Sequence, residues 1–321
     1  MEVPTTPRGK GPFVPFVGRR SPSSTRMRGR TTTSAAVVLV DNGSRRAASS
    51  LTLRAAATAL SLALGGREVL PASIAFSDGV PAADLGGQPA HTLRQALGGL
   101  VERGEHSAIV TPLFLGPSGA IRRGLNACAD DLDDSFQLSV GACLVDENQP
   151  ADERVARALA AQVLHAARRV GARPPLKVLL VDHGTPSRPV NAVRSRLTCE
   201  LRRLLGARAS AVGEASMERR DGSEYDFNDP LLERALRAPP FDQGDVILAM
   251  AFLLPGRHAG DGGDVAQIVQ GAQADSAASA PLRVHTTPPL ATHPLVVDVL
   301  ADRVRASDAA LAASGGATAG G

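Results

Sequence analysis

The sequence predicts an α/β protein built from two tandem units, each a small parallel sheet flanked by helices. Two observations carry this prediction. Residues 37–44 (VVLVDNGS) and 178–185 (VLLVDHGT) agree at five of eight positions, which indicates an internal duplication. In the second copy, short apolar segments alternate with amphipathic ones, an order typical of a parallel sheet. The length of 321 residues suits two domains of ordinary size.

Two further matches support the duplication. Residues 114–117 (FLGP) match residues 252–255 (FLLP) at an offset of 138. Between them, residues 76–78 (FSD) fall opposite residues 216–218 (SME) at an offset of 140. Three blocks in one order at a nearly constant offset indicate duplication and not chance.

The second copy shows its elements most clearly. Residues 177–182 (KVLLVD) form a short continuous apolar run, as expected of a strand that is buried on both faces. Gly206 ends an amphipathic helix, and Asp229 with Pro230 offers an N-cap and a first-turn proline. The expected strands are 177–182, 209–217, 245–254 and 282–286, and the expected helices are 191–205, 229–237, one from about 263, and 294–313.

The rest of the chain divides around these copies. The first copy runs from residue 36 to about 145, and an acidic, polar stretch at 146–152 leads into a connecting helix that ends at Val170. We therefore predict a degenerate N-terminal repeat at 34–150, a C-terminal repeat with the active site at 151–313, and a disordered tail at 314–321.

Residues 1–33 differ from the rest in composition. They hold seven basic residues and one acidic residue, with many Ser, Thr and Pro and no continuous apolar core. This composition predicts an organellar transit peptide, with the plastid preferred over the mitochondrion and cleavage between Arg26 and Ala35. A disordered tail, or a start codon misassigned upstream of Met27, would look the same.

Composition argues against several classes of protein. Subtracting the leader's net charge of +6 from the chain's +3 leaves −3 for residues 34–321, so nucleic-acid binding loses its main support. No apolar run reaches the roughly 20 residues that a membrane span needs. Cys128, Cys143 and Cys199 form no CxxC pair, and a reducing compartment is the simplest interpretation.

Three potential metal ligands follow three different strands of the second copy. His183 directly follows the first strand, Glu218 ends the second, and His258 lies just beyond the third. Because ligands bind beyond the carboxyl ends of parallel strands, these side chains should converge on one rim. Two imidazoles and a carboxylate suit a borderline divalent metal such as Fe²⁺, Co²⁺, Ni²⁺ or Zn²⁺.

Each of these residues also has a purely structural explanation. A lone histidine at a strand end is more often a surface residue, and Glu218 could pair with the adjacent Arg219 or Arg220. No P-loop, complete GxGxxG or GxSxG motif occurs. The first copy has other residues at the matching places, namely Asn42, Asp78 and Ala120.

Taken together, three motifs resemble a known family. HGT at 183–185 behind a strand, FLLPGRH at 252–258 and PPLATHP at 288–294 resemble the CbiX-type sirohydrochlorin chelatases in their two-domain form. This resemblance covers most of residues 176–305. It implies two tandem chelatase-like domains with a cleft between them. It also implies a class II tetrapyrrole chelatase, a lyase that inserts Co²⁺ or Fe²⁺ into sirohydrochlorin without ATP.

The resemblance also implies roles for single residues. His183 and His258 would be catalytic, and together with Glu218 they would hold the metal. Insertion displaces two pyrrole N–H protons, so the site needs bases near the ring, and imidazole exchanges protons near neutral pH. The further candidates for contact with the carboxylate-rich substrate are Gly184, Arg188, Arg194, Arg257 and His293, of which His293 could equally cap the last helix.

Expectations for cofactors and partners follow from the same resemblance. The metal is a substrate, and no iron–sulfur cluster is expected, because the chain has no cysteine after Cys199, unlike plant-type relatives. We expect a monomer that mimics a dimer, with one active site; if the leader targets the plastid, Fe²⁺ and sirohaem are preferred over Co²⁺ and cobalamin. The alternatives are a non-catalytic metal- or tetrapyrrole-binding protein and, less favoured, a chelatase that inserts Ni²⁺.

Overall fold

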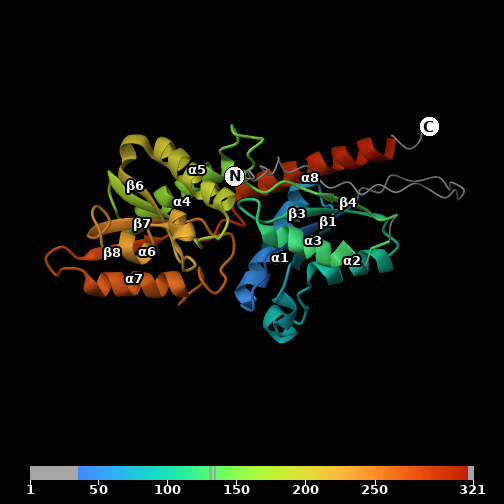
Figure 1. Ribbon diagram of the computed structural model, residues 1–321, viewed down its shortest axis with the longest axis horizontal. Helices are drawn as coiled ribbons and strands as arrows, with labels where there is room; N and C mark the ends of the chain where they lie inside the picture. Colours follow the sequence, from blue (N-terminus) through green and yellow to red (C-terminus); the bar gives the residue numbers. More distant parts are fainter. Residues whose placement is uncertain (1–34, 130–131, 134, 317–321) are drawn as a thin grey trace, which may run out of the picture.

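The computed structural model describes residues 35–129, 132–133 and 135–316 and shows one parallel four-stranded sheet in each half of the chain (Figure 1). The strand orders are β2-β1-β3-β4 and β6-β5-β7-β8, so the two sheets share one topology. This confirms the predicted α/β class and the tandem arrangement. The predicted leader at 1–33 and residues 317–321 of the predicted tail lie outside the described residues.

The N-terminal half is built around β1, whose six residues are all buried between two layers of helices. Its apolar run has no polar face, as expected of a central parallel strand. The elements in chain order are β1 (Ala36–Asp41), α1 (Ala47–Ala63), β2 (Val69–Ser73), η1 (Ser77–Gly79), η2 (Ala82–Leu85), α2 (Leu93–Glu102), β3 (Ser107–Pro112), α3 (Gly119–Ala129) and β4 (Gln137–Val140).

The C-terminal half repeats this order after the connecting helix α4. Its central strand β5 is again almost wholly buried. The elements are α4 (Arg154–Val170), β5 (Leu176–Asp182), α5 (Arg188–Leu205), η3 (Gly206–Arg208), β6 (Ala209–Ser216), η4 (Ser223–Asn228), α6 (Leu232–Ala235), β7 (Gly244–Met250), α7 (Asp264–Asp275), β8 (Leu282–Thr286) and α8 (Pro294–Gly316).

Some predicted boundaries are wrong. The helix expected at 229–237 is reduced to the four residues of α6, because Leu231 forms a β-bridge with Ser216 and keeps the preceding Asp229 and Pro230 out of the helix. The strand expected at 245–254 ends at Met250, and the chain then enters the loop that leads to α7. Helix α8 runs to Gly316, beyond the expected end at residue 313.

Backbone hydrogen bonds at the strand ends repeat in the two halves. The Leu113 N–H donates to the Val40 carbonyl at 2.7 Å, and the Ala251 N–H donates to the Val181 carbonyl at 2.8 Å. The residues after β3 and β7 therefore correspond at the predicted offset of 138. The duplication extends from the sequence to the hydrogen-bonding of the backbone.

The last helix crosses from one half to the other. Helix α8 packs against β3 and β4 of the N-terminal sheet and against α1, whereas α4 packs against β7 and β8. Figure 1 shows α8, in red, running along the N-terminal lobe. Arg67, just before β2, pairs with Asp308 on α8 at 2.6 Å. One cluster of buried apolar side chains joins residues of both halves, so the halves share a core.

None of the helices in the described part of the chain is both long and apolar enough to cross a membrane.

Candidate active site

His183 and His258 lie side by side although 75 residues separate them in the chain. Their Nε2 atoms are 3.2 Å apart, and their ring centroids are 4.4 Å apart. Strands β5 and β7 are neighbours in the sheet, so the residues that follow them meet at one edge. The structure thus brings together the two histidines that the sequence analysis singled out.

The other nitrogen of each ring faces an oxygen acceptor. His183 Nδ1 lies 3.0 Å from the Gly184 carbonyl oxygen, and His258 Nδ1 lies 2.6 Å from Asp264 Oδ2. A carbonyl and an ionised carboxylate only accept hydrogen bonds, which assigns a proton to Nδ1 of both rings. In the neutral rings, both Nε2 atoms then carry lone pairs and face each other. The pair is therefore a site for one positive charge, a proton or a metal ion.

Glu218 lies beside this pair. Its Oε1 is 3.4 Å from His183 Nε2. Arg219, a possible alternative partner, instead forms ion pairs with Asp226 and Asp229. Two ligand atoms about 2.1 Å from one ion at tetrahedral angles lie roughly 3.4 Å apart, so these spacings suit a shared ion. Within the described residues, however, no group of three His, Cys, Asp or Glu has the geometry to hold a metal by itself.

Gly184 allows the histidine loop and the glutamate loop to touch. Its φ is +89°, and a Cβ there would lie 1.9 Å from the Glu218 carbonyl oxygen. The Glu218 N–H also donates to the His183 carbonyl at 3.2 Å. Only glycine fits this position, and its presence fixes the spacing between two of the predicted ligands.

A buried polar network lies directly beneath the histidine loop. Asp182 Oδ1 accepts hydrogen bonds from the Gly184 N–H at 3.1 Å and from Ser216 Oγ at 2.9 Å. Arg194 Nη1 lies 3.4 Å from the same oxygen. Burial raises the pKa of Asp182, and the Arg194 charge and these hydrogen bonds oppose the rise. The network anchors the backbone that carries His183.

Arg194 is therefore not available to a substrate, and its prediction as a substrate contact is wrong. Its side chain is only 1% exposed. The guanidinium donates to Ser216 Oγ and to the carbonyls of Phe227 and Asn228. The position of residue 194 on α5 turns the side chain inward beneath the strand ends, away from solvent.

The remaining substrate candidates lie closer to the surface. The Arg188 guanidinium lies 4.6 Å from the centroid of the Phe227 ring, and the Arg257 side chain is 75% exposed. His293 Nδ1 accepts a hydrogen bond from the Leu295 N–H at 3.2 Å, so it caps α8, as the alternative interpretation expected. Burial lowers the pKa of His293.

The strand registers show that the predicted alignment of residues 76–78 with residues 216–218 is wrong. Asp41 pairs with Ser73 in the first sheet, as Asp182 pairs with Ser216 in the second. The offset between β2 and β6 at their carboxyl ends is therefore 143, not the 140 expected for this block.

Ala75, and not Asp78, consequently takes the position of Glu218. The Ala75 carbonyl lies against Gly43 just as the Glu218 carbonyl lies against Gly184. Gly43 has a φ of +91°, close to that of its counterpart. The first half keeps the backbone of the site and places a methyl group where the second half has a carboxylate.

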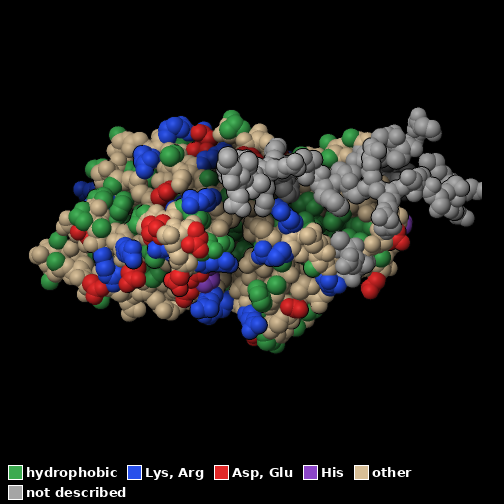
Figure 2. Space-filling model, viewed as in Figure 1, with side chains coloured by type: hydrophobic (Ala, Val, Ile, Leu, Met, Phe, Trp, Pro, Cys, Tyr) green, Lys and Arg blue, Asp and Glu red, His purple; other side chains and the backbone are tan. Residues whose placement is uncertain are grey.

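The histidine pair lies on an accessible surface. The side chain of His183 is 46% exposed and that of His258 is 29% exposed. Figure 2 shows acidic and basic side chains side by side on the face where the two lobes meet. A ligand in solvent can therefore reach both imidazoles.

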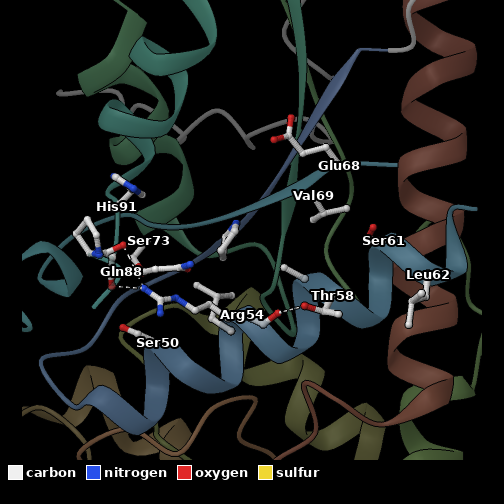
Figure 3. A pocket seen from close by; sticks show the side chains of 15 residues that line it. Ser50, Arg54, Thr58, Ser61, Leu62, Glu68, Val69, Ser73, Gln88 and His91 are labelled. Atoms are coloured by element: carbon white, nitrogen blue, oxygen red, sulfur yellow. Dashed lines mark hydrogen bonds between the residues drawn. The ribbon is translucent and has the colours of Figure 1, made fainter. Parts of the chain in front are cut away.

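A separate cavity of about 620 Å³ lies between α1 and the edge strand β2 (Figure 3). Arg54 lines it and donates to the carbonyls of Leu85 and Gln88. None of the predicted site residues lines this cavity. It is distinct from the histidine pair.

Sequence reasoning missed two residues that hold the site in place. The Val265 N–H donates to the His258 carbonyl at 3.1 Å, which brings Asp264, at the start of α7, to the His258 ring. Asn228 accepts from the Thr185 N–H and donates to its carbonyl, both at 2.9 Å. The glycine-rich run before α7 was the available signal for Asp264; nothing in the sequence marked Asn228.

Comparison with known proteins identifies the C-terminal part of the chain. Residues 177–307 match the family model CbiX. Residues 177–307 are thus similar to the CbiX family. The matched CbiX segment contains both histidines, Glu218 and Asp264, and it confirms the family resemblance drawn from the three motifs. No curated protein sequence matches the chain.

Three solved structures share the fold over 86% of this chain. SirB from Bacillus subtilis with Fe³⁺ matches with a TM-score of 0.59 at 16% identity, over 86% of this chain and 96% of that one. The sirohydrochlorin chelatase SirB from B. subtilis subspecies spizizenii in complex with cobalt matches with a TM-score of 0.56 at 15% identity, over 86% and 96%. CbiX, described as the terminal enzyme of sirohaem biosynthesis in denitrifying bacteria, matches with a TM-score of 0.55 at 16% identity, over 86% and 99%. The two-domain chelatase fold is thereby confirmed.

Proposed function

We propose that the protein is a sirohydrochlorin chelatase that inserts Fe²⁺ or Co²⁺ into the tetrapyrrole without ATP. The observation that carries this proposal is the pair of Nε2 atoms of His183 and His258, which face each other at 3.2 Å with both Nδ1 atoms occupied by acceptors. The match of residues 177–307 to the CbiX family model and the structural likeness to SirB and CbiX support the same activity.

The two histidines and Glu218 have different roles in metal insertion. Insertion exchanges one M²⁺ for two pyrrole protons, so the site must first hold a cation and then accept protons. The paired Nε2 lone pairs do both, because each binds either a metal ion or a proton. Glu218 adds negative charge beside His183 and favours the cation. Asp264 holds His258 in the tautomer that presents Nε2 to the substrate.

We propose that the metal is the substrate and that no resident cofactor is needed. The three cysteines lie on different elements or loops, and Cys128 is buried, Cys143 half-buried and Cys199 exposed. Burial raises the pKa of Cys143 to about 12, so its thiol is a poor cluster ligand at neutral pH. A monomer in the plastid stroma, with Fe²⁺ as the metal, completes the proposal.

The test is metal insertion by residues 34–321, purified anaerobically and mixed with sirohydrochlorin and either Fe²⁺ or Co²⁺. The absorbance change of insertion is followed for the wild type, for His183→Ala and for His106→Ala. His106 is exposed and lies outside the site, so its variant is a matched control. Acceleration that is lost only in His183→Ala supports the proposal. No acceleration by a folded protein that binds the ring would favour the non-catalytic tetrapyrrole-binding alternative.

A further inference from the structure

Phe76 has an unusual backbone for its residue type. Its φ is +70° and its ψ is −23°, and it is the one non-glycine residue with positive φ within the described ranges. A bulky residue in this region is strained. Its side chain is also unusual, since the residue is 53% exposed. An aromatic ring held in solvent by a strained backbone calls for a functional explanation.

The surrounding turn forces this conformation on Phe76. The Ser77 N–H donates to the Ala75 carbonyl at 2.9 Å and closes a three-residue turn around Phe76. Ser77 is buried, and its Oγ donates to the His91 carbonyl at 3.3 Å. The Gly79 N–H donates to the Phe76 carbonyl at 3.3 Å. The main chain is thus fixed on both sides of the exposed ring.

The turn that carries Phe76 is linked to the histidine loop through neighbouring contacts of the N-terminal half. Ala75 corresponds to Glu218, so Phe76 follows β2 at the place where Arg219 follows β6. The Ala75 carbonyl packs on Gly43, and the next residue, Ser44, lies 3.7 Å from where a Cβ on Gly256 would be. Gly256 is two residues before His258 in the chain. A short loop of the N-terminal half therefore bridges Phe76 and the histidine loop.

An arginine side chain lies beside the Phe76 ring. The Arg45 guanidinium lies 5.9 Å from the centroid of the Phe76 ring, and Arg45 is itself exposed. An exposed aromatic face stacks on a flat conjugated ring, and an arginine binds carboxylates at its edge. These are the two surfaces that a tetrapyrrole with peripheral carboxylates presents.

We propose that Phe76 and Arg45 form a binding platform through which the N-terminal half holds the tetrapyrrole over the histidine pair. This inference rests on the proposed function. The half that lost its metal ligands then supplies substrate affinity: Phe76 contacts the macrocycle face, and Arg45 pairs with a carboxylate.

The test uses Phe76→Gly, because glycine tolerates the left-handed φ and removes only the ring. The variant should raise the Kd for metal-free sirohydrochlorin, measured by its fluorescence, and its KM in the insertion assay by roughly tenfold, with kcat unchanged. Its Tm should rise by about 1–3 °C as strain is relieved. Arg45→Gln should raise Kd a few-fold and weaken its dependence on salt. Leu62→Ala, at a remote side chain that is 74% exposed, should change neither constant.

The outcomes separate this inference from the proposed function. A wild type that accelerates insertion, with a Phe76→Gly variant of unchanged Kd and KM, overturns the platform and leaves the chelatase intact. A wild type that binds the ring without accelerating insertion overturns the chelatase, and loss of that binding in Phe76→Gly still supports the platform. A Kd raised equally by Leu62→Ala would also overturn the platform.

Discussion

Replacing Asp264 with asparagine should slow metal insertion by roughly 10- to 30-fold and leave tetrapyrrole binding unchanged. Asp264 Oδ2 lies 2.6 Å from His258 Nδ1, and the asparagine amide can instead donate to that nitrogen and move the ring proton to Nε2. A hydrogen bond to a charged group contributes about 1.5–3 kcal/mol. The two side chains are 29% and 31% exposed, so we take about 1.5–2 kcal/mol, which corresponds to the stated loss in rate.

The assay is the initial rate of insertion at saturating sirohydrochlorin, with ¹⁵N NMR of the imidazoles as a second readout. We expect kcat to fall, KM to stay constant, and His258 to lose its single Nδ1–H tautomer. Asp245→Asn is the matched control, because Asp245 accepts from His285 at 3.0 Å in a second Asp–His pair at the opposite end of β7. Asp264→Asn with the wild-type kcat, or an Asp245→Asn variant that is equally slow, would refute this reasoning.

Three further predictions concern the architecture beneath the site. Gly184→Ala should cost roughly 1–3 kcal/mol of unfolding free energy in urea and most of the activity, because its Cβ would strike the Glu218 carbonyl oxygen; unchanged stability would contradict the model of that contact. Arg194→Met should cost about 3 kcal/mol or more in the same measurement, since it leaves Asp182 as a buried charge without its cation; a loss under 1 kcal/mol would show that the pair is not essential. Burial raises the pKa of Asp41 above its usual 3.8, so the native state binds this proton more tightly than the unfolded chain does, and protonation adds to the stability of the native state. That contribution is present below about pH 3.8 and is lost as the pH rises through the raised pKa. Asp41→Asn should therefore be more stable than the wild type at pH 7 in thermal melts, and a lower Tm there would be the contrary result.

The strands could be predicted from the sequence because burial on both faces leaves a continuous apolar run. The strand expected at 282–286 has the bounds of β8, and the strands expected at 177–182 and 209–217 differ from β5 and β6 by one residue. The helix expected at 229–237 failed because local capping signals compete with a tertiary contact. The bridge between Leu231 and Ser216 keeps that segment extended.

The residues of the candidate site also differ in how well the sequence predicted them. His183 and His258 could be found because each follows a strand, and parallel strands present their carboxyl ends on one edge. Asp264 was missed, because the glycine-rich run before α7 indicates a loop but not that this loop folds back onto His258. Arg194 could have been excluded from the helical period of α5, whose buried residues include Asn191, Arg194, Thr198, Leu201 and Leu205. An arginine in phase with leucines faces the core.

The exchange of helix α8 makes the two repeats inseparable. Cutting the chain after residue 145 would leave β3 and β4 without the helix that covers them, and would leave α8 without the sheet against which it packs. A duplicated protein in which each helix packed on the sheet of its own repeat could lose one copy and keep the other folded. Here the N-terminal sheet packs against the last helix of the C-terminal repeat, so neither repeat has a complete core without the other.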